Sequence, residues 1–283
     1  MIMLRTKSGL RVLGPDDLPE VLALLSADPV CNVFVEYRAR QTKLNPHWLG
    51  GEVWGYSSDG ELRALCHAGA NLVPVNADSD ALDTFATRAA AKGRSCSSIV
   101  GLSDQVAELW SRLRWHWGPA RLVREAQPFM KIDRPPLVEA DPAVRPVRKD
   151  EIDILYPAAV AMFTEEVGVS PEASSGRGQY ESGVRQLVER ELALARIEHD
   201  RVVFKAEIGA VTPSACQVQG VWVDPRLRGQ GLAAPGMAAV VDYALRRVAP
   251  VVTLYVNEHN QSARRAYQRV GFAEVARFNT VLF

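Results

Sequence analysis

Two arginines and two glycines follow a short β-rich run in the second half of the chain. The run Gly220-Val221-Trp222-Val223 leads through Asp224-Pro225 into Arg226-x-x-Gly229-x-Gly231, which opens an apolar helical pattern. The first amides of a helix lack intrahelical partners and lie at its positive end, so they can converge on a pyrophosphate. Glycines remove the Cβ atoms that would keep a phosphate away, and Arg226 or Arg228 can add positive charge. The segment predicts an anion-binding loop.

The same residues have a plainer interpretation. Arginine and glycine often meet in surface loops, so a strand-to-helix turn with solvated arginines is the alternative. No Gly-Lys-Ser/Thr follows the loop, which excludes a Walker motif, and the Rossmann glycine spacing is absent. The flanking strand and helix favour the anion site.

Elements that can position this loop follow from hydrophobic periodicity. The predicted strands of the second half cover residues 193–197, 201–211, 215–223, 251–256 and 276–282, and the predicted helices cover residues 181–191, the stretch after Gly231, and residues 260–270. The small polar residues 170–179 predict a loop. Pro235 lies shortly after the glycine loop, where it is expected to remove one helical hydrogen bond and to favour a kink.

A proline-rich stretch divides the chain. Residues 133–146 read DRPPLVEADPAVRP, which favours an extended connector. We therefore expect domains at residues 1–133 and 144–283, joined by a linker at 134–143. Residues 10–18 (LRVLGPDDL) and 144–152 (VRPVRKDEI) each resemble a strand followed by an acid-capped helix. This echo predicts two domains of one architecture, with chance similarity as the alternative.

Composition narrows the functional classes. Lys plus Arg and Asp plus Glu each total 33, and hydrophobic residues make up 47% of the chain. This balance gives no attraction toward nucleic acid or an anionic membrane, and no apolar run is long enough to span a bilayer. The start lacks the apolar core of a secretory signal, so we expect a cytoplasmic protein. The four cysteines and five histidines are scattered, so no metal site is predicted.

The segments VWVDPRLRGQGLAA and LYVNEHNQSARRAYQRVGF together resemble the two signature motifs of the GCN5-related N-acetyltransferase (GNAT) superfamily. The resemblance covers about the last 140 residues. It implies an α/β fold of two GNAT-like domains in tandem, each with a mixed, mostly antiparallel sheet flanked by helices. The whole chain also resembles an actinobacterial two-domain group with a degenerate, uncharacterised N-terminal domain.

The resemblance further implies residue roles. Acetyl-CoA would be the cosubstrate, without a metal, and its pantetheine arm would pair with the backbone of Val221 and Val223. Asn257 and Asn260 fall in the second motif, and Asn260 can touch the cofactor arm or cap its helix. The cofactor-binding residues of the loop are Arg226, which can add charge, and those implied to contact the pyrophosphate through their amides, Arg228, Gly229, Gln230, Gly231, Leu232 and Ala233.

Catalytic residues are also implied. Tyr267 falls where the family often places the tyrosine that protonates the departing thiolate, with core packing as the alternative. Gln217 and Gln219 occupy the strand region where many relatives carry a glutamate. A turn at residues 212–214 places Glu207 opposite Gln219 on the next strand, so Glu207 is the candidate base, with an exposed strand glutamate as the alternative.

The resemblance to the GNAT superfamily implies transfer of an acetyl group to a primary amine of a small molecule or a protein. A mycothiol-synthase-like tandem enzyme is one alternative, and a CoA-binding sensor or scaffold without turnover is another. In the first half, residues 73–90 are the expected counterpart of the cofactor region, but no Arg-x-x-Gly-x-Gly is present. We therefore expect that half to have lost CoA binding.

Overall fold

The computed structural model describes residues 9–283, apart from the side chains of residues 174–177, and the chain divides into two compact units. The first unit holds the described residues up to Phe129 together with Tyr255–His259 and Glu274–Phe283, and the second holds Met130–Leu254 and Asn260–Ala273. The ranges 1–133, 134–143 and 144–283 stay a prediction. The units differ from these ranges chiefly because segments near the C-terminus cluster with the first unit.

The first unit contains one sheet with helices on both sides. Its elements are β1 (Gly9–Leu13), η1 (Pro15–Asp17), α1 (Leu18–Leu25), α2 (Val33–Thr42), α3 (Pro46–Leu49), β2 (Glu52–Ser58), β3 (Glu61–Ala68), β4 (Asn71–Val75), α4 (Ser79–Lys92), β5 (Ser98–Leu102), α5 (Ser103–Trp117), most of β6 (Leu122–Ile132) and β12 (Ala273–Leu282). The strand order is β1-β2-β3-β4-β5-β12-β6. β4 pairs with β5 in parallel, whereas β1·β2, β2·β3, β3·β4 and β5·β12 are antiparallel.

The second unit repeats this plan. Its elements are β7 (Arg145–Pro146), η2 (Lys149–Glu151), α6 (Ile152–Val167), α7 (Glu172–Glu189), β8 (Ala193–Glu198), β9 (Arg201–Val211), β10 (Cys216–Val223), η3 (Pro225–Leu227), α8 (Ala233–Arg247), β11 (Val252–Tyr255) and α9 (Gln261–Val270). The strand order is β7-β8-β9-β10-β11, with β10 and β11 parallel and the remaining described pairs antiparallel. In each unit, therefore, the first three strands along the chain are followed by two strands that pair in parallel, β4 with β5 and β10 with β11.

A shared side-chain arrangement marks the start of each unit. In the first, the Arg11 guanidinium pairs with Asp17, and Asp17 Oδ2 accepts from the Gly14 amide at 2.7 Å. In the second, Arg145 pairs with Glu151 at 2.7 Å, and Glu151 accepts from the Arg148 amide at 2.9 Å. Both carboxylates lie six residues after the arginine and three after the amide. The echo in the sequence thus corresponds to the same strand-to-helix entry in both units.

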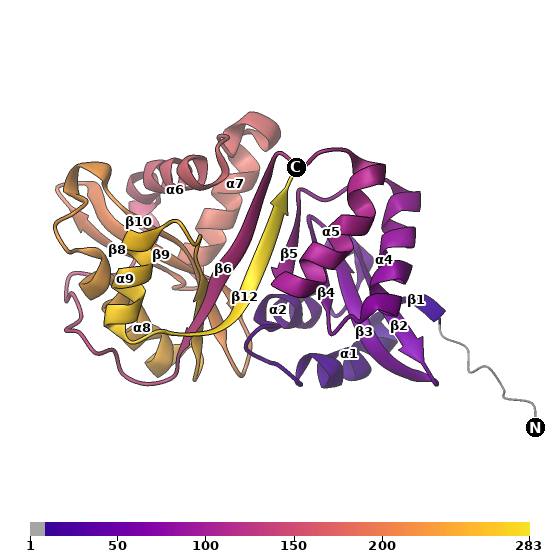
Figure 1. Cartoon of the computed structure of the whole chain (residues 1–283). Helices are drawn as coiled ribbons and strands as arrows, with labels where there is room; N and C mark the ends of the chain where they lie inside the picture. Colours follow the sequence, from indigo (N-terminus) through magenta and orange to yellow (C-terminus); the bar gives the residue numbers. More distant parts are fainter. Residues whose placement is uncertain (1–8) are drawn as a thin grey trace, which may run out of the picture. The chain divides into compact units, whose positions relative to one another are not determined.

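Alternating side chains of the first sheet build two separate cores. Trp54, Cys66 and Leu72 point into a core with α4 and α5, while their neighbours Val53, Leu65 and Val73 point into a core with α1 and α2. Figure 1 shows α4 and α5 side by side in this unit. The sheet is therefore covered by helices on both faces.

The strands of the second unit are covered in the same way. One face, with Ala193 and Ala195 of β8, forms a core with α6 and α7 (Figure 1). Phe204 of β9 meets α8, where a Cβ at Gly236 would lie 2.8 Å from the ring. A glycine is needed here because the helix approaches the strand this closely.

The predicted strands at residues 193–197, 201–211 and 215–223 are confirmed, and β9 has the predicted bounds. The predicted loop at residues 170–179 is wrong, because α7 begins at Glu172. Tyr180 of α7 packs against Phe163 of α6, with ring centroids 5.4 Å apart. Val184 and Val188, on the same helix as Tyr180, are buried. Tertiary burial of one helical face thus outweighs the weak helix propensity of the Ser and Gly residues.

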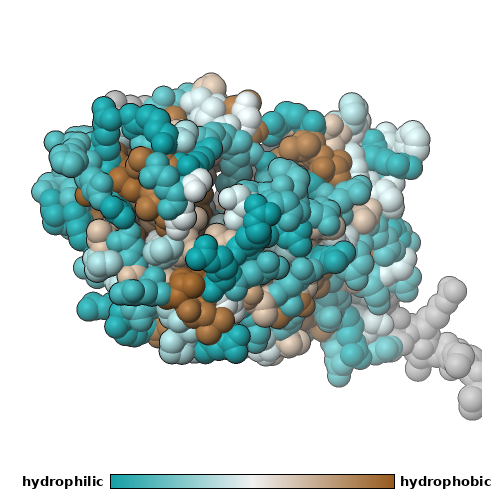
Figure 2. Space-filling model, turned by 60° about the vertical axis from the view of Figure 1, so that its left-hand side comes forward, coloured by the Kyte–Doolittle hydropathy of each residue, from teal (hydrophilic) through white to brown (hydrophobic). Residues whose placement is uncertain are grey.

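Among the described residues, no helix is long and apolar enough to cross a membrane. Hydrophilic residues cover most of the face seen in Figure 2, with hydrophobic patches between them. The four cysteines are free thiols, and Cys66, Cys96 and Cys216 are buried. Within residues 9–283 as described, no cluster of metal-ligating side chains is present.

Candidate functional site

The glycine loop between β10 and α8 is shaped by one carboxylate and two left-handed residues. Buried Asp224 accepts from the Arg226 amide at 3.0 Å and pairs with the Arg226 guanidinium. These bonds lower the pKa of Asp224 to about 2. Gly229 and Gly231 have φ values of +80° and +81°, which a residue with a side chain rarely adopts. An added Cβ at either position would meet no atom within 4 Å, so lack of space is not the reason for glycine. The backbone conformation is what requires it.

This loop leaves backbone donors open. Among the described residues, the amides of Gly229, Gln230 and Gly231 make no hydrogen bond that meets the usual geometric limits. The amides at the start of α8 lack intrahelical partners by helix geometry, and the helix dipole adds positive potential there. The loop can therefore bind a phosphate-like anion, with room above both glycines.

Pro235 does not disturb the anion site. The expected loss of a helical hydrogen bond is wrong, because Pro235 is the third residue of α8 and its position needs no intrahelical donor. The next amide, of Gly236, donates to Leu232 O at 3.1 Å, and α8 continues to Arg247.

The strand that leads into the loop has an open edge. β10 pairs with β11 only at Cys216 and Gln217, so its later residues diverge from β11. The amide of Asp224 donates to Val203 O on β9, so the backbone of Val223 points the opposite way, toward the open edge. Val221 lies two residues earlier on the same strand. This edge can pair with an extended ligand, as predicted for the pantetheine arm.

Both arginines of the loop are held by carboxylates. Arg228 Nη2 donates to Glu165 of α6 at 2.7 Å, and its Nε donates to Val223 O at 3.1 Å. Glu165 also accepts from Trp222 Nε1 at 3.2 Å. With Arg226 paired to Asp224, the guanidinium charges are locally balanced, and the loop amides are the backbone donors that remain open.

The predicted pairing of Glu207 with Gln219 is confirmed by the strand register. Gln219 lies over the neighbouring glycine, since a Cβ at Gly209 would be 2.3 Å from its side chain. Glu207 is only 5% exposed, so the alternative of an exposed strand glutamate is wrong. Its role as a base stays a prediction.

A partner of Glu207 was missed by the sequence reasoning. Lys205 is fully buried, and its Nζ donates to Glu207 Oε1 at 2.6 Å and to Gly220 O at 3.0 Å. The signal in the sequence was two opposite charges two residues apart in an otherwise apolar strand, because such residues share one face. Gly220 lies in a bulge of β10 and has φ +60°.

Tyr267 of α9 is buried, with 6% of its surface exposed. Burial raises its pKa well above the usual value, and the negative charge of Glu166 raises it further. A phenol in this setting stays protonated at neutral pH and can act as a proton donor. Glu166 follows Glu165 in α6, so the end of this helix connects the surroundings of Tyr267 with those of Arg228.

The two predicted asparagines lie in different units. Asn260 caps α9, with its side chain accepting from the Ala263 amide at 3.1 Å, so its capping role is confirmed. Asn257 clusters with the first unit, where its Oδ1 accepts from Gln127 Nε2 at 2.9 Å. Contacts of either residue with a cofactor stay a prediction.

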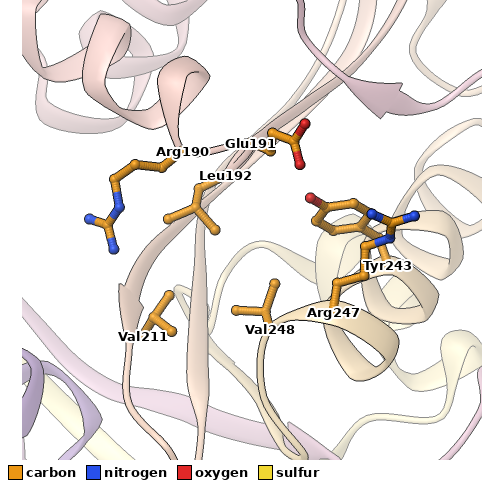
Figure 3. Close-up of a pocket in the computed structure, with 7 residues that line it drawn as sticks. All are labelled: Arg190, Glu191, Leu192, Val211, Tyr243, Arg247 and Val248. Carbon is orange, nitrogen blue, oxygen red and sulfur yellow. The ribbon is translucent and has the colours of Figure 1, made fainter.

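A separate hollow lies at the other end of α8. Figure 3 shows the guanidinium of Arg247 over the ring of Tyr243, 5.9 Å from its centroid, with Glu191 facing Tyr243. The remaining lining residues are Arg190, Leu192, Val211 and Val248. Because α8 has 15 residues, its two ends are about 20 Å apart. The hollow is therefore distinct from the glycine loop.

The matching position in the first unit is already filled. Asp78 caps α4 by accepting from the Ala81 amide at 2.9 Å, and Asp80 adds negative charge in the first turn. A carboxylate at a helix N-terminus uses the donors and the potential that a phosphate would need. The first unit is thus degenerate at the place where the second has its open loop.

Two family models match this chain. Residues 51–155 match a domain of unknown function (DUF4081), and residues 184–272 match the acetyltransferase (GNAT) family. A search of curated proteins found no match.

Solved structures share the fold across nearly the whole chain. A GCN5-related N-acetyltransferase from Sphaerobacter thermophilus is 20% identical with a TM-score of 0.65, covering 99% of this chain and 96% of that one. A tandem GNAT protein from the clavulanic acid biosynthesis pathway is 14% identical with a TM-score of 0.57, covering 98% of each. An acetyltransferase from the GNAT family from Colwellia psychrerythraea is 11% identical with a TM-score of 0.58, covering 97% of this chain and 99% of that one.

The predicted fold, two GNAT-like domains each with a mostly antiparallel sheet flanked by helices, is confirmed. The chain has the fold of tandem GNAT proteins: residues 184–272 match the acetyltransferase (GNAT) family, and residues 51–155, which precede them, match a domain of unknown function.

Proposed function

We propose that this chain transfers an acetyl group from acetyl-CoA to a primary amine of a small molecule or a protein. The observation that carries the proposal is the open edge of β10 leading directly into the loop with unbonded amides at Gly229, Gln230 and Gly231. Few ligands need an extended polar arm and a pyrophosphate in that order, and CoA is one of them. The match of residues 184–272 to the GNAT family supports the same reaction.

The donor would bind chiefly through the backbone. The pyrophosphate would accept from amides between Arg228 and Ala233, while the pantetheine arm would pair with Val221 and Val223. Because the side chains of Arg226 and Arg228 are held by Asp224 and Glu165, the amides supply most of the recognition.

The reaction needs a base and an acid but no covalent enzyme intermediate. The amine loses a proton to Glu207, directly or through water, and its nitrogen forms a bond to the thioester carbon. The carbon–sulfur bond breaks, and Tyr267 donates a proton to the leaving thiolate. The phenol of Tyr267 carries its proton at neutral pH and therefore has a proton to donate.

One observation favours a second candidate, a CoA-binding sensor without turnover. The Glu207 carboxylate is already engaged by Lys205, and neither Gln217 nor Gln219 can act as a base. Such a protein would bind CoA and release no thiol from acetyl-CoA.

Two measurements test the transferase and sensor hypotheses. Thiol release from acetyl-CoA is measured with polyamines, amino sugars, peptides and desacetylmycothiol, and CoA binding is measured by calorimetry. Desacetylmycothiol is included because both units repeat one architecture, as in a mycothiol-synthase-like enzyme. Turnover with any amine supports the proposal, and binding without turnover favours the sensor. Failure to bind CoA contradicts both.

A further inference from the structure

A buried ion pair lies beside the bulge of β10. The side chain of Lys205 is 0% exposed and that of Glu207 is 7% exposed, with 2.6 Å between Nζ and Oε1. The same ammonium donates to Gly220 O at 3.0 Å. One lysine thus joins the carboxylate of β9 to the backbone of β10.

Stability alone does not account for this pair. Removing two charges from water costs several kcal/mol, and apolar residues of similar volume are often as stabilising as a buried pair. The opposite face of β9 shows that this strand accepts apolar residues, since Phe204, Ala206 and Ile208 are buried there. The position of the pair, next to the open edge of β10, therefore calls for another role.

The surroundings of Gly220 are closely packed. A Cβ on Gly220 would lie 3.0 Å from Met162 Cε, 3.1 Å from Glu207 Oε2 and 3.2 Å from Lys205 Nζ. Glycine at this position therefore lets the backbone of β10 lie close to both charged groups. Oε1 accepts from the ammonium, and Oε2 lies beside Gly220.

The bond from Lys205 also fixes a peptide plane. In a trans peptide the carbonyl and the next N–H point in opposite directions, and the structure has no cis peptide bond among its described residues. Holding Gly220 O toward Lys205 Nζ therefore directs the N–H of Val221 to the opposite side of the strand. One ammonium orients both a carboxylate and a backbone donor of β10.

We propose that Lys205 is a positioning residue of the acyl-transfer site, which fixes Glu207 and the Gly220–Val221 peptide in the arrangement that the reaction requires. This inference rests on the proposed function, in which Glu207 takes the proton of the amine. Lys205 itself touches neither substrate, and acts through the groups it holds.

A double-mutant cycle tests the role. Lys205→Met is compared in two backgrounds, the unaltered chain and Glu207→Gln, and kcat, KM and CoA affinity are measured for each. In the unaltered background we expect kcat to fall about tenfold or more, with the Kd of CoA changed less than about threefold. In the Glu207→Gln background the same substitution should lower kcat by a clearly smaller factor, because the carboxylate is gone and only the Gly220–Val221 peptide is still positioned by Lys205.

A structural role gives another pattern. If Lys205 only stabilised the fold, both backgrounds would lose apparent activity in step with the folded fraction, and kcat per folded molecule would be constant. Lys149→Met, on an exposed residue of the same unit, is the matched control and should leave all parameters unchanged.

Folding is checked by the thermal midpoint and by CoA binding. Should Lys205→Met not fold, Lys205→Leu replaces it in the cycle, because leucine also removes the ammonium that donates to Glu207 and to Gly220 O. Unchanged kcat in a variant that binds CoA normally, or equal losses in both backgrounds, would overturn the role of Lys205. Absence of turnover by the unaltered chain would instead contradict the proposed function itself.

Discussion

At the scale of single residues, carboxylates hold the side chains that surround the glycine loop. Glu165 binds Arg228 from α6, and its other oxygen accepts from Trp222 on β10. The side chains of Glu165 and Arg228 are 44% and 47% exposed, so the pair is weak, worth about 0.2–1 kcal/mol. A bound pyrophosphate would compete with Glu165 for the same guanidinium.

The substitution Glu165→Gln removes this competitor. We expect the Kd of CoA to fall by about twofold to fivefold, since up to about 1 kcal/mol of ion pairing no longer opposes binding. Calorimetry at low and high salt measures the change, which should shrink at high salt. Glu189→Gln, on an exposed residue of α7, is the control. Weaker binding in Glu165→Gln would show that the carboxylate organises the loop instead.

The proposed acid gives a second prediction. Tyr267→Phe should lower kcat by about 100-fold while the KM for acetyl-CoA changes little, because the phenol acts on the leaving thiolate. Burial raises the pKa of Tyr267, so the loss should be equal across the neutral range of a pH–rate profile. Tyr243→Phe, at the far end of α8, should retain full activity. Unimpaired turnover in Tyr267→Phe would remove the proposed acid.

The sequence predicted contacts between residues joined by a short turn, but not contacts between residues that are far apart along the chain. The short turn at residues 212–214 determines the pairing of Glu207 with Gln219, so a count along two strands was enough. The two opposite charges in β9 indicate that Lys205 and Glu207 share a face, but the packing of α6 beside them, where Met162 lies close to Gly220, involves residues far apart in the sequence. Likewise, nothing near Arg228 in sequence indicates a partner 63 residues away.

At the scale of elements, β10, the glycine loop and α8 together form the proposed cofactor site. The divergence of β10 from β11 opens the edge, the two left-handed glycines turn the chain, and α8 supplies further amides. Because a Cβ at Gly231 would meet no atom within 4 Å, only its φ of +81° demands glycine. A substitution there tests the backbone conformation without a steric clash.

We expect Gly231→Ala to weaken CoA binding about fivefold or more, because a left-handed alanine costs about 1–2 kcal/mol. Titration calorimetry measures the Kd, and circular dichroism checks the fold. Gly183→Ala is matched to it, since Gly183 lies in α7 with ordinary helical φ and an open surround. That control should leave binding unchanged and slightly stabilise α7. Equal affinity in both variants would contradict the role of the loop.

Elements with strong periodicity were predicted well from the sequence. The run RVVFKAEIGAV gave the bounds of β9, and the apolar stripe after Gly231 gave α8. Residues 170–179 were misjudged because Ser and Gly carry weak local preferences, and α7 forms only where Tyr180, Val184 and Val188 pack against neighbouring elements. The bounds of such a helix depend on tertiary contacts.

At the scale of the whole molecule, the repeated strand-to-helix entries contribute to acid stability. Arg145 and the Arg148 amide lower the pKa of Glu151 to about 2, against the opposing effect of burial. A carboxyl with a lowered folded-state pKa stabilises the fold above its ordinary value of 4.5 and loses this effect as pH falls toward 2. Asp17 shows the same direction in the first unit.

Glu151→Gln should therefore lower the free energy of unfolding by about 2–3 kcal/mol at pH 7 and flatten its decline between pH 4.5 and 2. Urea unfolding at a series of pH values measures both effects. Asp150→Asn, on a neighbour whose side chain is 73% exposed, should match the unaltered protein. Parallel pH curves for Glu151→Gln and the unaltered protein would contradict the assignment.

The last strand of the chain completes the first unit. β12 pairs with β5 from Phe278↔Leu102 to Leu282↔Ser98, and Phe283 packs against Trp110 and Trp117 at 5.5 and 5.7 Å. Deleting residues 274–283 should expose the edge of β5 and abolish the cooperative unfolding of the first unit, followed by tryptophan fluorescence and hydrogen exchange of β5. Phe283→Ala, which keeps the strand, should lower the midpoint and preserve cooperativity. Unchanged protection of β5 in the truncated chain would show that the first unit folds without its C-terminal strand.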